Sequence, residues 1–282
     1  MNRVFAGFFL LQGRQPVTKL CNISLESSSN VQSSHLTAYQ EDGFVIVRGL
    51  VPSDLARQVA DQADRLLGDS SVIDADNLRC RFKIRPGDGA QVLDAIDPVM
   101  DLLPVVREIA ESSSLNAVLT EIYGESPRLF KDKLILKPPG SPGYPWHQDY
   151  ISWPFFPESF VTVMVALDEA RSDNGCLEIV RGSHKRGYLS PRDGDFHDLP
   201  EAGLTAEDRI KTPLSPGDAV IFGCYTVHGS GPNRSTSPRR QLYLSYNKDS
   251  DGGDQRTAHY RYFHAWLRRR YEEYGAKQAF FR

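Results

Sequence analysis

The sequence predicts a mainly β fold, a barrel or jelly roll, with a helical N-terminal half packed against it. Before residue 124, apolar residues recur at helical spacing over two long stretches. After residue 128, short strand-like runs are separated by turns that contain glycine and proline, a pattern typical of jelly rolls and barrels. At 282 residues with 40% apolar composition, the chain is long enough to bury a full core.

The predicted organisation is one domain preceded by a tail. Residues 1–35 carry basic residues early and a run rich in Ser, Asn and Gln late, and they are predicted to form a disordered tail or a targeting segment. Residues 36–282 are predicted to form a single domain, with its β-core at about 128–248.

The elements expected in the N-terminal half follow from periodicity and capping residues. In order they are a helix from Thr37, a strand Phe44–Val47, an amphipathic helix that opens at Pro52, a polar loop Asp69–Asp97 over the site, and a helical stretch Asp101–Tyr123. In the amphipathic helix, Leu55, Val59, Ala63, Leu66 and Leu67 share the apolar face.

The C-terminal half is predicted to supply the sheet. Its expected strands are Phe130–Leu136, Phe160–Leu167, Cys176–Val180, Ala219–Phe222 and Gln241–Tyr246. A Pro/Gly loop from Pro138 to Pro145 ends the first strand, and turn signals stand at Asp173-Asn174-Gly175 and Pro216-Gly217-Asp218.

Composition excludes several classes of partner. The net charge is −3 without a basic stripe, which argues against nucleic acid. No run of 18 apolar residues exists, so no membrane span is expected. The four cysteines show no CxxC spacing and are interpreted as reduced intracellular thiols, which favours the cytoplasm. A peroxisomal or organellar location stays open, although the last three residues are not Ser-Lys-Leu. The oligomeric state is not predicted.

His147 and Asp149 are the most informative pair in the chain. They are two residues apart, so on an extended strand their side chains point to the same face. A distant histidine can complete a metal site; His228 is the candidate and His184 is the rival. Two histidines and one carboxylate are typical of non-heme Fe(II) oxygenases. Zinc hydrolases use similar ligands, so these residues alone leave a hydrolytic zinc enzyme open.

Six short motifs between about Phe130 and Tyr246 carry a family resemblance, with a weaker likeness back to Tyr39. They are Leu136-Lys137-Pro138-Pro139, Trp146-His147-Gln148-Asp149, Asp173-Asn174-Gly175-Cys176-Leu177, Arg181-Gly182-Ser183-His184-Lys185, Pro216-Gly217-Asp218, and His228-Gly229-Ser230-Gly231-Pro232-Asn233 followed by Arg239-Arg240. In this order they resemble the phytanoyl-CoA dioxygenase (PhyH) family of Fe(II)/2-oxoglutarate oxygenases. The resemblance implies a double-stranded β-helix core, jelly-roll and cupin-like, flanked by α-helices.

The resemblance also implies roles for individual residues. His147, Asp149 and His228 would be the catalytic iron ligands, and O2 would use the open position. Arg239, eleven residues after His228, would bind the distal carboxylate of 2-oxoglutarate, a task that suits a planar guanidinium. The other expected co-substrate contacts are Ser230, Lys133, Met164 and Gln148, and the expected substrate contacts are Tyr150, Trp153 and Arg234.

The predicted function is hydroxylation of a small molecule, with 2-oxoglutarate converted to succinate and CO2. Asp149 argues against a halogenase, because related halogenases lack this carboxylate. An acyl-CoA hydroxylase and a non-catalytic jelly-roll binding protein remain alternatives, and the presence of Arg239 and Ser230 speaks against the second. Arg240 is predicted to face away from Arg239 and to form an ion pair. The other histidines, His35, His197, His259 and His264, are interpreted as ordinary surface or core residues.

Overall fold

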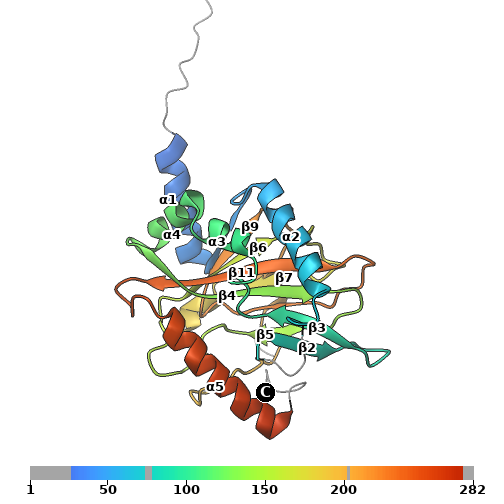
Figure 1. The fold of residues 1–282 in the computed structure, drawn as a ribbon. Helices are drawn as coiled ribbons and strands as arrows, with labels where there is room; N and C mark the ends of the chain where they lie inside the picture. The colour runs from blue at the N-terminus through green and yellow to red at the C-terminus, as the bar shows by residue number, and fades with distance from the viewer. Residues whose placement is uncertain (1–26, 74–77, 202–203, 276–282) are drawn as a thin grey trace, which may run out of the picture.

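Two antiparallel sheets form the centre of the molecule in the computed structural model, which describes residues 27–73, 78–201 and 204–275 (Figure 1). The larger sheet has seven strands in the order β1-β9-β6-β11-β4-β3-β2, and the smaller has four in the order β5-β10-β7-β8. The sheet strands alternate between distant parts of the chain, as in a jelly roll. The fold is therefore mostly antiparallel sheet, as the C-terminal half of the sequence predicted.

The larger sheet draws strands from both halves of the chain. Its strands are β1 (Phe44–Val47), β9 (Ala219–Gly223), β6 (Val161–Ala166), β11 (Arg239–Lys248), β4 (Pro127–Lys137), β3 (Gln91–Ile96) and β2 (Cys80–Ile84). The smaller sheet contains β5 (Tyr144–His147), β10 (His228–Ser230), β7 (Leu177–Val180) and β8 (Arg209–Thr212). The helices are α1 (Ser27–Asp42), α2 (Ser53–Leu67), α3 (Pro104–Ala110), α4 (Ser113–Tyr123) and α5 (Arg256–Tyr274).

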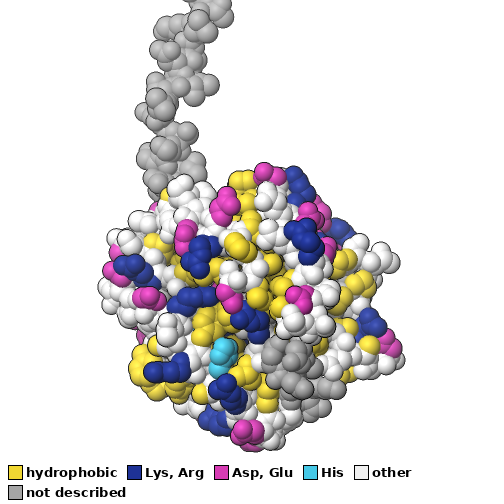
Figure 2. Space-filling model, viewed as in Figure 1, with side chains coloured by type: hydrophobic (Ala, Val, Ile, Leu, Met, Phe, Trp, Pro, Cys, Tyr) yellow, Lys and Arg dark blue, Asp and Glu magenta, His cyan; other side chains and the backbone are white. Residues whose placement is uncertain are grey.

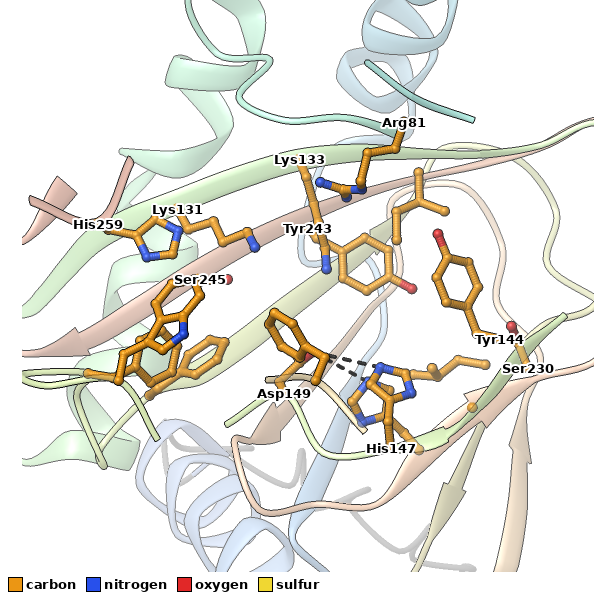
Figure 3. Close-up of a pocket in the computed structure, with 18 residues that line it drawn as sticks. Arg81, Lys131, Lys133, Tyr144, His147, Asp149, Ser230, Tyr243, Ser245 and His259 are labelled. Atoms are coloured by element: carbon orange, nitrogen blue, oxygen red, sulfur yellow. Dashed lines mark ion pairs between the residues drawn. The ribbon is translucent and has the colours of Figure 1, made fainter. Parts of the chain in front are cut away.

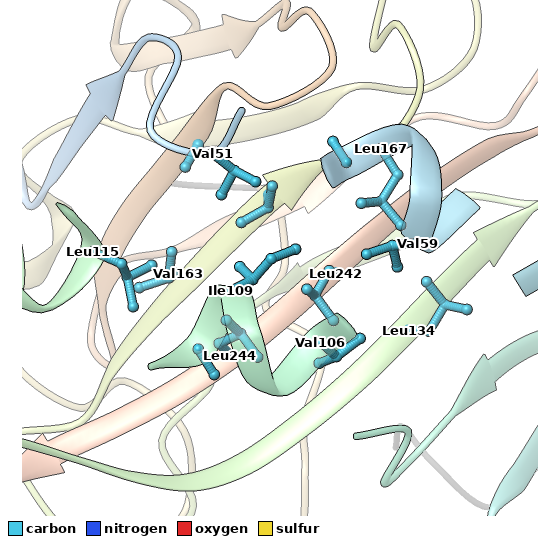
Figure 4. Close-up of a cluster of buried hydrophobic side chains, with 14 of the residues drawn as sticks. Val51, Val59, Val106, Ile109, Leu115, Leu134, Val163, Leu167, Leu242 and Leu244 are labelled. Atoms are coloured by element: carbon cyan, nitrogen blue, oxygen red, sulfur yellow. The ribbon is translucent and has the colours of Figure 1, made fainter. Parts of the chain in front are cut away.

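The main hydrophobic core lies between the larger sheet and helices α2, α3 and α4 (Figure 4). Apolar side chains from the helices, such as Val59, Ile109 and Leu115, pack on the outer face of β4, β6 and β11. Leu134, Leu242 and Leu244 project from that face and are fully buried. Because strand residues alternate between faces, the neighbours of these residues point to the other side, toward the smaller sheet.

A second core fills part of the space between the two sheets. It joins Ile135, Met164 and Tyr243 of the larger sheet to Leu177 and Ile179 of the smaller one. The rest of that space is polar, since β4 also directs Lys131 and Lys133 to this face. Burying lysines between sheets is costly, so this face is the part of the fold that calls for a functional explanation.

Helix α5 covers one end of the space between the sheets. Phe263, Trp266 and Leu267 on this helix pack against Trp153 and Phe196 from the loops. The sequence pattern gave no clear signal for α5, and β8 was also not predicted. Among the described residues, no helix is long and apolar enough to cross a membrane. The face shown in Figure 2 carries acidic and basic side chains intermixed.

The expectation of a helical N-terminal half is not confirmed. The segment Asp69–Asp97, expected to be a loop, contains the β2–β3 hairpin, which extends the larger sheet at its edge. The stretch Asp101–Tyr123 contains two helices instead of one, because the helical conformation is interrupted at Glu111 and Ser112 between α3 and α4. Helix α1 begins at Ser27, whereas the pattern placed its start at Thr37. Leu67 lies at the end of α2 and is 40% exposed, so it is not part of the buried face.

The predicted tail is only partly described. Residues 1–26 lie outside the described residues, and residues 27–35 belong to α1. The expected strands Phe44–Val47 and Phe130–Leu136 correspond to β1 and to the central part of β4. The last predicted strand, Gln241–Tyr246, lies inside β11, which starts at Arg239 and therefore carries that arginine on the sheet itself.

Candidate metal centre and adjoining cavity

His147, Asp149 and His228 come together where the two short strands β5 and β10 pair. His147 ends β5 and lies directly opposite His228 in the antiparallel register, so the two imidazoles are neighbours. Asp149 follows two residues after β5. The Nε2 atoms of His147 and His228 lie 3.9 and 3.7 Å from Oδ1 of Asp149. Potential ligand atoms of the three residues all lie within 4.8 Å of one another, which suits one metal ion.

Hydrogen bonds behind these residues orient their ligand atoms. Nδ1 of His147 lies 2.8 Å from the carbonyl oxygen of Pro145, and Nδ1 of His228 lies 2.9 Å from that of Thr226. A carbonyl only accepts, so each Nδ1 carries the proton and each Nε2 presents a lone pair. Oδ2 of Asp149 accepts from Oγ1 of Thr162 at 2.7 Å, which leaves Oδ1 for a metal. The donor set therefore fits a divalent transition metal.

The electrostatic environment keeps the three side chains in their metal-binding protonation states. Burial lowers the pKa of His147, and the neighbouring His228 lowers it further. Burial likewise lowers the pKa of His228. For Asp149, burial raises the pKa, but His228 and Lys133 outweigh burial and hold it below its usual range. Neutral imidazoles and an ionised carboxylate are the forms that bind metal.

A cavity between the sheets opens beside this centre (Figure 3). Figure 3 shows Asp149 and His147 at one side of it, with Lys133 and Arg81 opposite. Tyr144 and Ser230 lie at one end, while Lys131 and His259 lie at the other. The lining also includes an aromatic group at the His259 end, made of Trp153, Phe156, Phe160 and Phe196. The cavity thus has two ends that meet at the metal centre.

Arg239 lies near the Tyr144 end and is almost fully buried, with 1% of its surface exposed. Arg239 and Tyr243 are separated by an even number of residues along β11, so their side chains point to the same face of the sheet, and Tyr243 lines the cavity. The pKa of Arg239 is lowered by burial, and Tyr243 and Tyr144 partly offset that effect. Within the described part of the chain, its Nε and Nη1 atoms have no hydrogen-bond partner. A buried guanidinium with two unused donors fits a carboxylate that binds there.

Ser230 lines the same end of the cavity and is held by Lys137. Nζ of Lys137 donates to Oγ of Ser230 at 2.7 Å and to the carbonyl oxygen of Gly231 at 2.7 Å. Lys137 pairs directly with Arg239 across β4 and β11. Because the Ser230 oxygen already accepts a hydrogen bond, its own hydroxyl proton is directed elsewhere. The hydroxyl proton of Ser230 is therefore available for another acceptor.

Arg81, Lys131 and Lys133 form a cationic group on the opposite side of the cavity from the metal centre. Nη1 of Arg81 lies 2.9 Å and Nζ of Lys131 lies 3.4 Å from Oδ2 of Asp97, which is fully buried. No carboxylate among the described residues lies within 4.0 Å of the Lys133 ammonium group. Burial, followed by the charge of Lys131, lowers the pKa of Lys133 to about 8. The group carries more positive than negative charge.

The structure brings some of the predicted site residues together and not others. Ser230, Lys133 and Trp153 line the cavity with the three candidate ligands. Five others lie outside its lining, and one of them is the buried Arg239. Met164 is fully buried in the core between the sheets. The Gln148 side chain binds the backbone of Gly187, Tyr225 and Leu189. The Tyr150 ring packs on Tyr188, Tyr225 and Phe156, and Arg234 is exposed.

Other residues have environments that the sequence showed only in part. Arg240 forms ion pairs with Asp168 and Asp64, as predicted for a residue on the opposite face from Arg239. His184 lies outside the metal centre, where its Nε2 meets the carbonyl oxygen of Gln40. His259 is buried among aromatic side chains, as a core histidine would be, and it also lines the cavity. Arg81 was missed, because its strand was taken for a loop.

Comparisons with known proteins agree with this geometry. The family model for "Phytanoyl-CoA dioxygenase (PhyH)" matches residues 39–241. A 2-aminoethylphosphonate dioxygenase from the uncultured bacterium HF130_AEPn_1 is 27% identical over 218 residues, which cover 77% of this chain and 81% of that protein. A methylphosphonate hydroxylase from Gimesia maris is 34% identical over 155 residues, which cover 55% of this chain and 58% of that protein.

A solved structure gives the same result for the fold. EctD from S. alaskensis with 2-oxoglutarate and 5-hydroxyectoine has a TM-score of 0.65 and 25% identity, and the match covers 78% of this chain and 77% of that one. The family match spans most of the described sheets and all three candidate ligands. The chain therefore belongs to the phytanoyl-CoA dioxygenase (PhyH) family, and it is an iron- and 2-oxoglutarate-dependent dioxygenase that acts on a small molecule.

Proposed function

We propose that His147, Asp149 and His228 hold Fe(II) in an enzyme that hydroxylates a small molecule, and that Arg239 and Ser230 hold the distal carboxylate of 2-oxoglutarate. When bound, the iron and 2-oxoglutarate supply the oxidising chemistry, in which O2 is consumed and succinate and CO2 are released. The protein supplies the geometry of the ligands, the charge that binds the co-substrate and the exclusion of bulk water.

The observation that carries this proposal is the buried guanidinium of Arg239 with its Nε and Nη1 unused. A fully buried cation without a carboxylate partner is expensive. A structural role would have brought an acid within reach, as Asp168 lies beside Arg240. The distal carboxylate of 2-oxoglutarate would complete Arg239, and the hydroxyl of Ser230 would add a further donor. A zinc hydrolase or a non-catalytic binding protein would not require these carboxylate-binding donors of Arg239 and Ser230.

The chain's own residues position the reactants. The backbone carbonyls of Pro145 and Thr226 hold the two imidazoles, and Thr162 holds Asp149. Because these contacts fix the ligand atoms before metal binds, little ordering cost remains when it does. Aromatic side chains at the His259 end of the cavity, with Trp153 among them, exclude water from the space where the substrate would lie.

The test is a pair of measurements on the full chain. Anaerobic addition of Fe(II) and 2-oxoglutarate should give a weak visible charge-transfer band, and the same protein should then release succinate in the presence of O2 and a substrate. Relatives named for methylphosphonate and 2-aminoethylphosphonate make small phosphorus oxyanions the first compounds for the panel. The proposal fails if the protein binds Fe(II) but gives neither the band nor succinate.

We also propose that residues 36–282 act as one domain in a reducing compartment such as the cytoplasm. Support for the domain comes from α5, whose Tyr260 hydroxyl donates to the backbone of β4 at Asp132. Support for the compartment comes from Cys80, Cys176 and Cys224, which are buried free thiols in the described structure.

A further inference from the structure

The cationic group of Arg81, Lys131 and Lys133 lacks a full set of counter-charges. Among the described residues, the one carboxylate that forms an ion pair with these cations is Asp97, which contacts Arg81 and Lys131. The other acids nearby are already engaged. Asp94 pairs with Lys83, and Asp132 on the far face of β4 pairs with Arg256. Asp149 belongs to the metal centre. Counted over the part of the chain that the structure describes, three cations and one carboxylate leave an excess of two positive charges around Lys133.

A strand does not place two lysines inside a sandwich for stability. Lys131 and Lys133 are two residues apart on β4, so both point into the space between the sheets, and Ile135 follows on the same face. An apolar residue at position 133 would extend the second core at no electrostatic cost. Lys133 instead lines the cavity across from Asp149 (Figure 3). Such local conflicts with good packing are expected at functional sites.

We propose that the substrate carries a compact tetrahedral oxyanion with two negative charges, a phosphonate or a phosphate monoester, and that Lys133 binds it with Lys131 and Arg81 behind. This inference rests on the proposed function and names the substrate class of the same site. A dianion matches the excess charge, whereas a single carboxylate leaves one cation uncompensated. Bound there, the anion lies opposite the metal centre and directs its neighbouring carbon toward it.

This assignment separates two anion sites in one cavity. The co-substrate site lies at the Tyr144 and Ser230 end, where Arg239 has its unused donors. The substrate site lies at the Lys131 and His259 end. Lys133, expected from the family resemblance to contact 2-oxoglutarate, is assigned here to the substrate instead. Two cation sets allow both anions to be bound at once without sharing a partner.

The rest of the substrate end selects for a small organic group. Trp153, Phe156 and Phe196 provide apolar walls. His259 adds one polar point, because its Nε2 is buried without a hydrogen-bond partner among the described residues. Burial lowers the pKa of His259 well below its ordinary value, so the ring is neutral. A neutral imidazole does not compete with Lys133 for the anion and is available for a hydroxyl or amino group of the substrate.

The test uses the full chain loaded anaerobically with Fe(II) and 2-oxoglutarate, because a compound that binds beside the metal perturbs the visible band. Four matched probes are titrated: ethylphosphonate, ethyl phosphate, butyrate and butan-1-ol. Ethylphosphonate or ethyl phosphate should bind at least about 30-fold more tightly than butyrate, which corresponds to about 2 kcal/mol. The order of these two probes tells a phosphonate substrate from a phosphate ester.

Lys133→Met is the decisive variant, with Lys211→Met as the matched control on an exposed position of β8. Lys133→Met should raise the Kd of the tighter probe about 30-fold or more and should raise the Tm of the metal-free protein, since a buried cation is replaced by a side chain that packs. Lys133→Gln tests the same loss of charge if the methionine variant folds poorly. Lys211→Met should change neither value.

Three outcomes would overturn the inference. Equal binding of butan-1-ol and ethylphosphonate would remove the anion requirement. A Lys133→Met variant that weakens 2-oxoglutarate binding but not probe binding would return Lys133 to the co-substrate. In both cases the visible band is present, so the proposed function stands. Absence of the band in the unmodified protein would overturn the proposed function, and the inference with it.

Discussion

Replacing Arg239 by methionine should greatly weaken the binding of 2-oxoglutarate without unfolding the protein. The side chain is 1% exposed, and no carboxylate among the described residues forms an ion pair with it. Two charge-assisted hydrogen bonds, from Nε and Nη1, are available to the co-substrate. Truncating one partner of such a buried pair costs about 2–5 kcal/mol. At about 1.4 kcal/mol per decade, the KM for 2-oxoglutarate should rise roughly 30-fold to 4,000-fold.

The assay combines co-substrate titration of succinate release with thermal unfolding. A ligand at 100 times its Kd stabilises the native state by about 2.7 kcal/mol, so 2-oxoglutarate should raise the Tm of the metal-loaded protein. At the same concentration Arg239→Met should show at most about a third of that stabilisation, while its Tm without co-substrate should be equal to or above that of the parent. Arg239→Lys should recover only part of the affinity, because the compact charge of an ammonium group does not reproduce the planar guanidinium with its two parallel donors.

The neighbouring Arg240 provides the control, with the opposite signature. Its guanidinium bonds both carboxylate oxygens of Asp168 and also the carbonyl oxygen of Ala60. Arg240→Met should therefore lower the Tm and leave the KM for 2-oxoglutarate nearly unchanged. If Arg240→Met weakens co-substrate binding and Arg239→Met does not, the assignment of β11 to its two faces is wrong. If neither variant matters, the co-substrate clamp lies elsewhere.

Three further predictions concern the metal centre and Lys133. His228→Ala should abolish Fe(II) binding by the folded protein, measured by equilibrium dialysis, whereas His184→Ala should retain it; the reverse result would exchange their roles. Thr162→Val removes the hydrogen bond to Oδ2 of Asp149 and should weaken Fe(II) binding about 10- to 100-fold; an unchanged affinity would show that this contact does not position the carboxylate. Burial lowers the pKa of Lys133 to about 8 in the folded state. Between about pH 8 and the ordinary lysine pKa, Lys133 is therefore protonated in the unfolded chain but neutral in the folded protein. The parent protein consequently gains stability as the pH rises through that range. The Tm advantage of metal-free Lys133→Met should therefore be largest below pH 8 and shrink above it, and a constant advantage would contradict the low pKa.

The metal centre was predictable because its information is local. The spacing of His147 and Asp149 determines that both side chains reach one point, whatever the rest of the fold does. The opposite directions of Arg239 and Arg240 follow from the same alternation along β11. The choice of His228 as the third candidate ligand needed the family resemblance, because nothing local to His228 distinguishes it from His184. His228 pairs with His147 between strands that are far apart in the sequence, and a local sequence pattern does not reveal such a contact.

The substrate end was less predictable because its residues meet only through tertiary pairing. Arg81 lies on β2, whose hairpin partner β3 pairs with β4 over only two residue pairs. The segment between Asp69 and Asp97 is rich in charged residues and contains Gly87 and Gly89, so the sequence pattern favoured a loop, and the strands are evident only from their pairing at the sheet edge. His259 reaches the cavity because α5 packs across the end of the sandwich, and helical periodicity does not report such a long-range contact.

The position of the β2–β3 hairpin at the margin of the larger sheet has an evolutionary consequence. Of the two strands next to the candidate metal centre, β10 lies inside the smaller sheet, and β5 lies at its edge but is held by its pairing with β10, so that a change in either disturbs the ladder. Arg81 sits on an outermost strand, and Trp153 and His259 sit on a loop and a terminal helix. Peripheral segments accept substitutions and insertions more readily than core strands do. Related proteins can therefore evolve to oxidise different molecules through substitutions in these peripheral segments, while the iron chemistry stays the same.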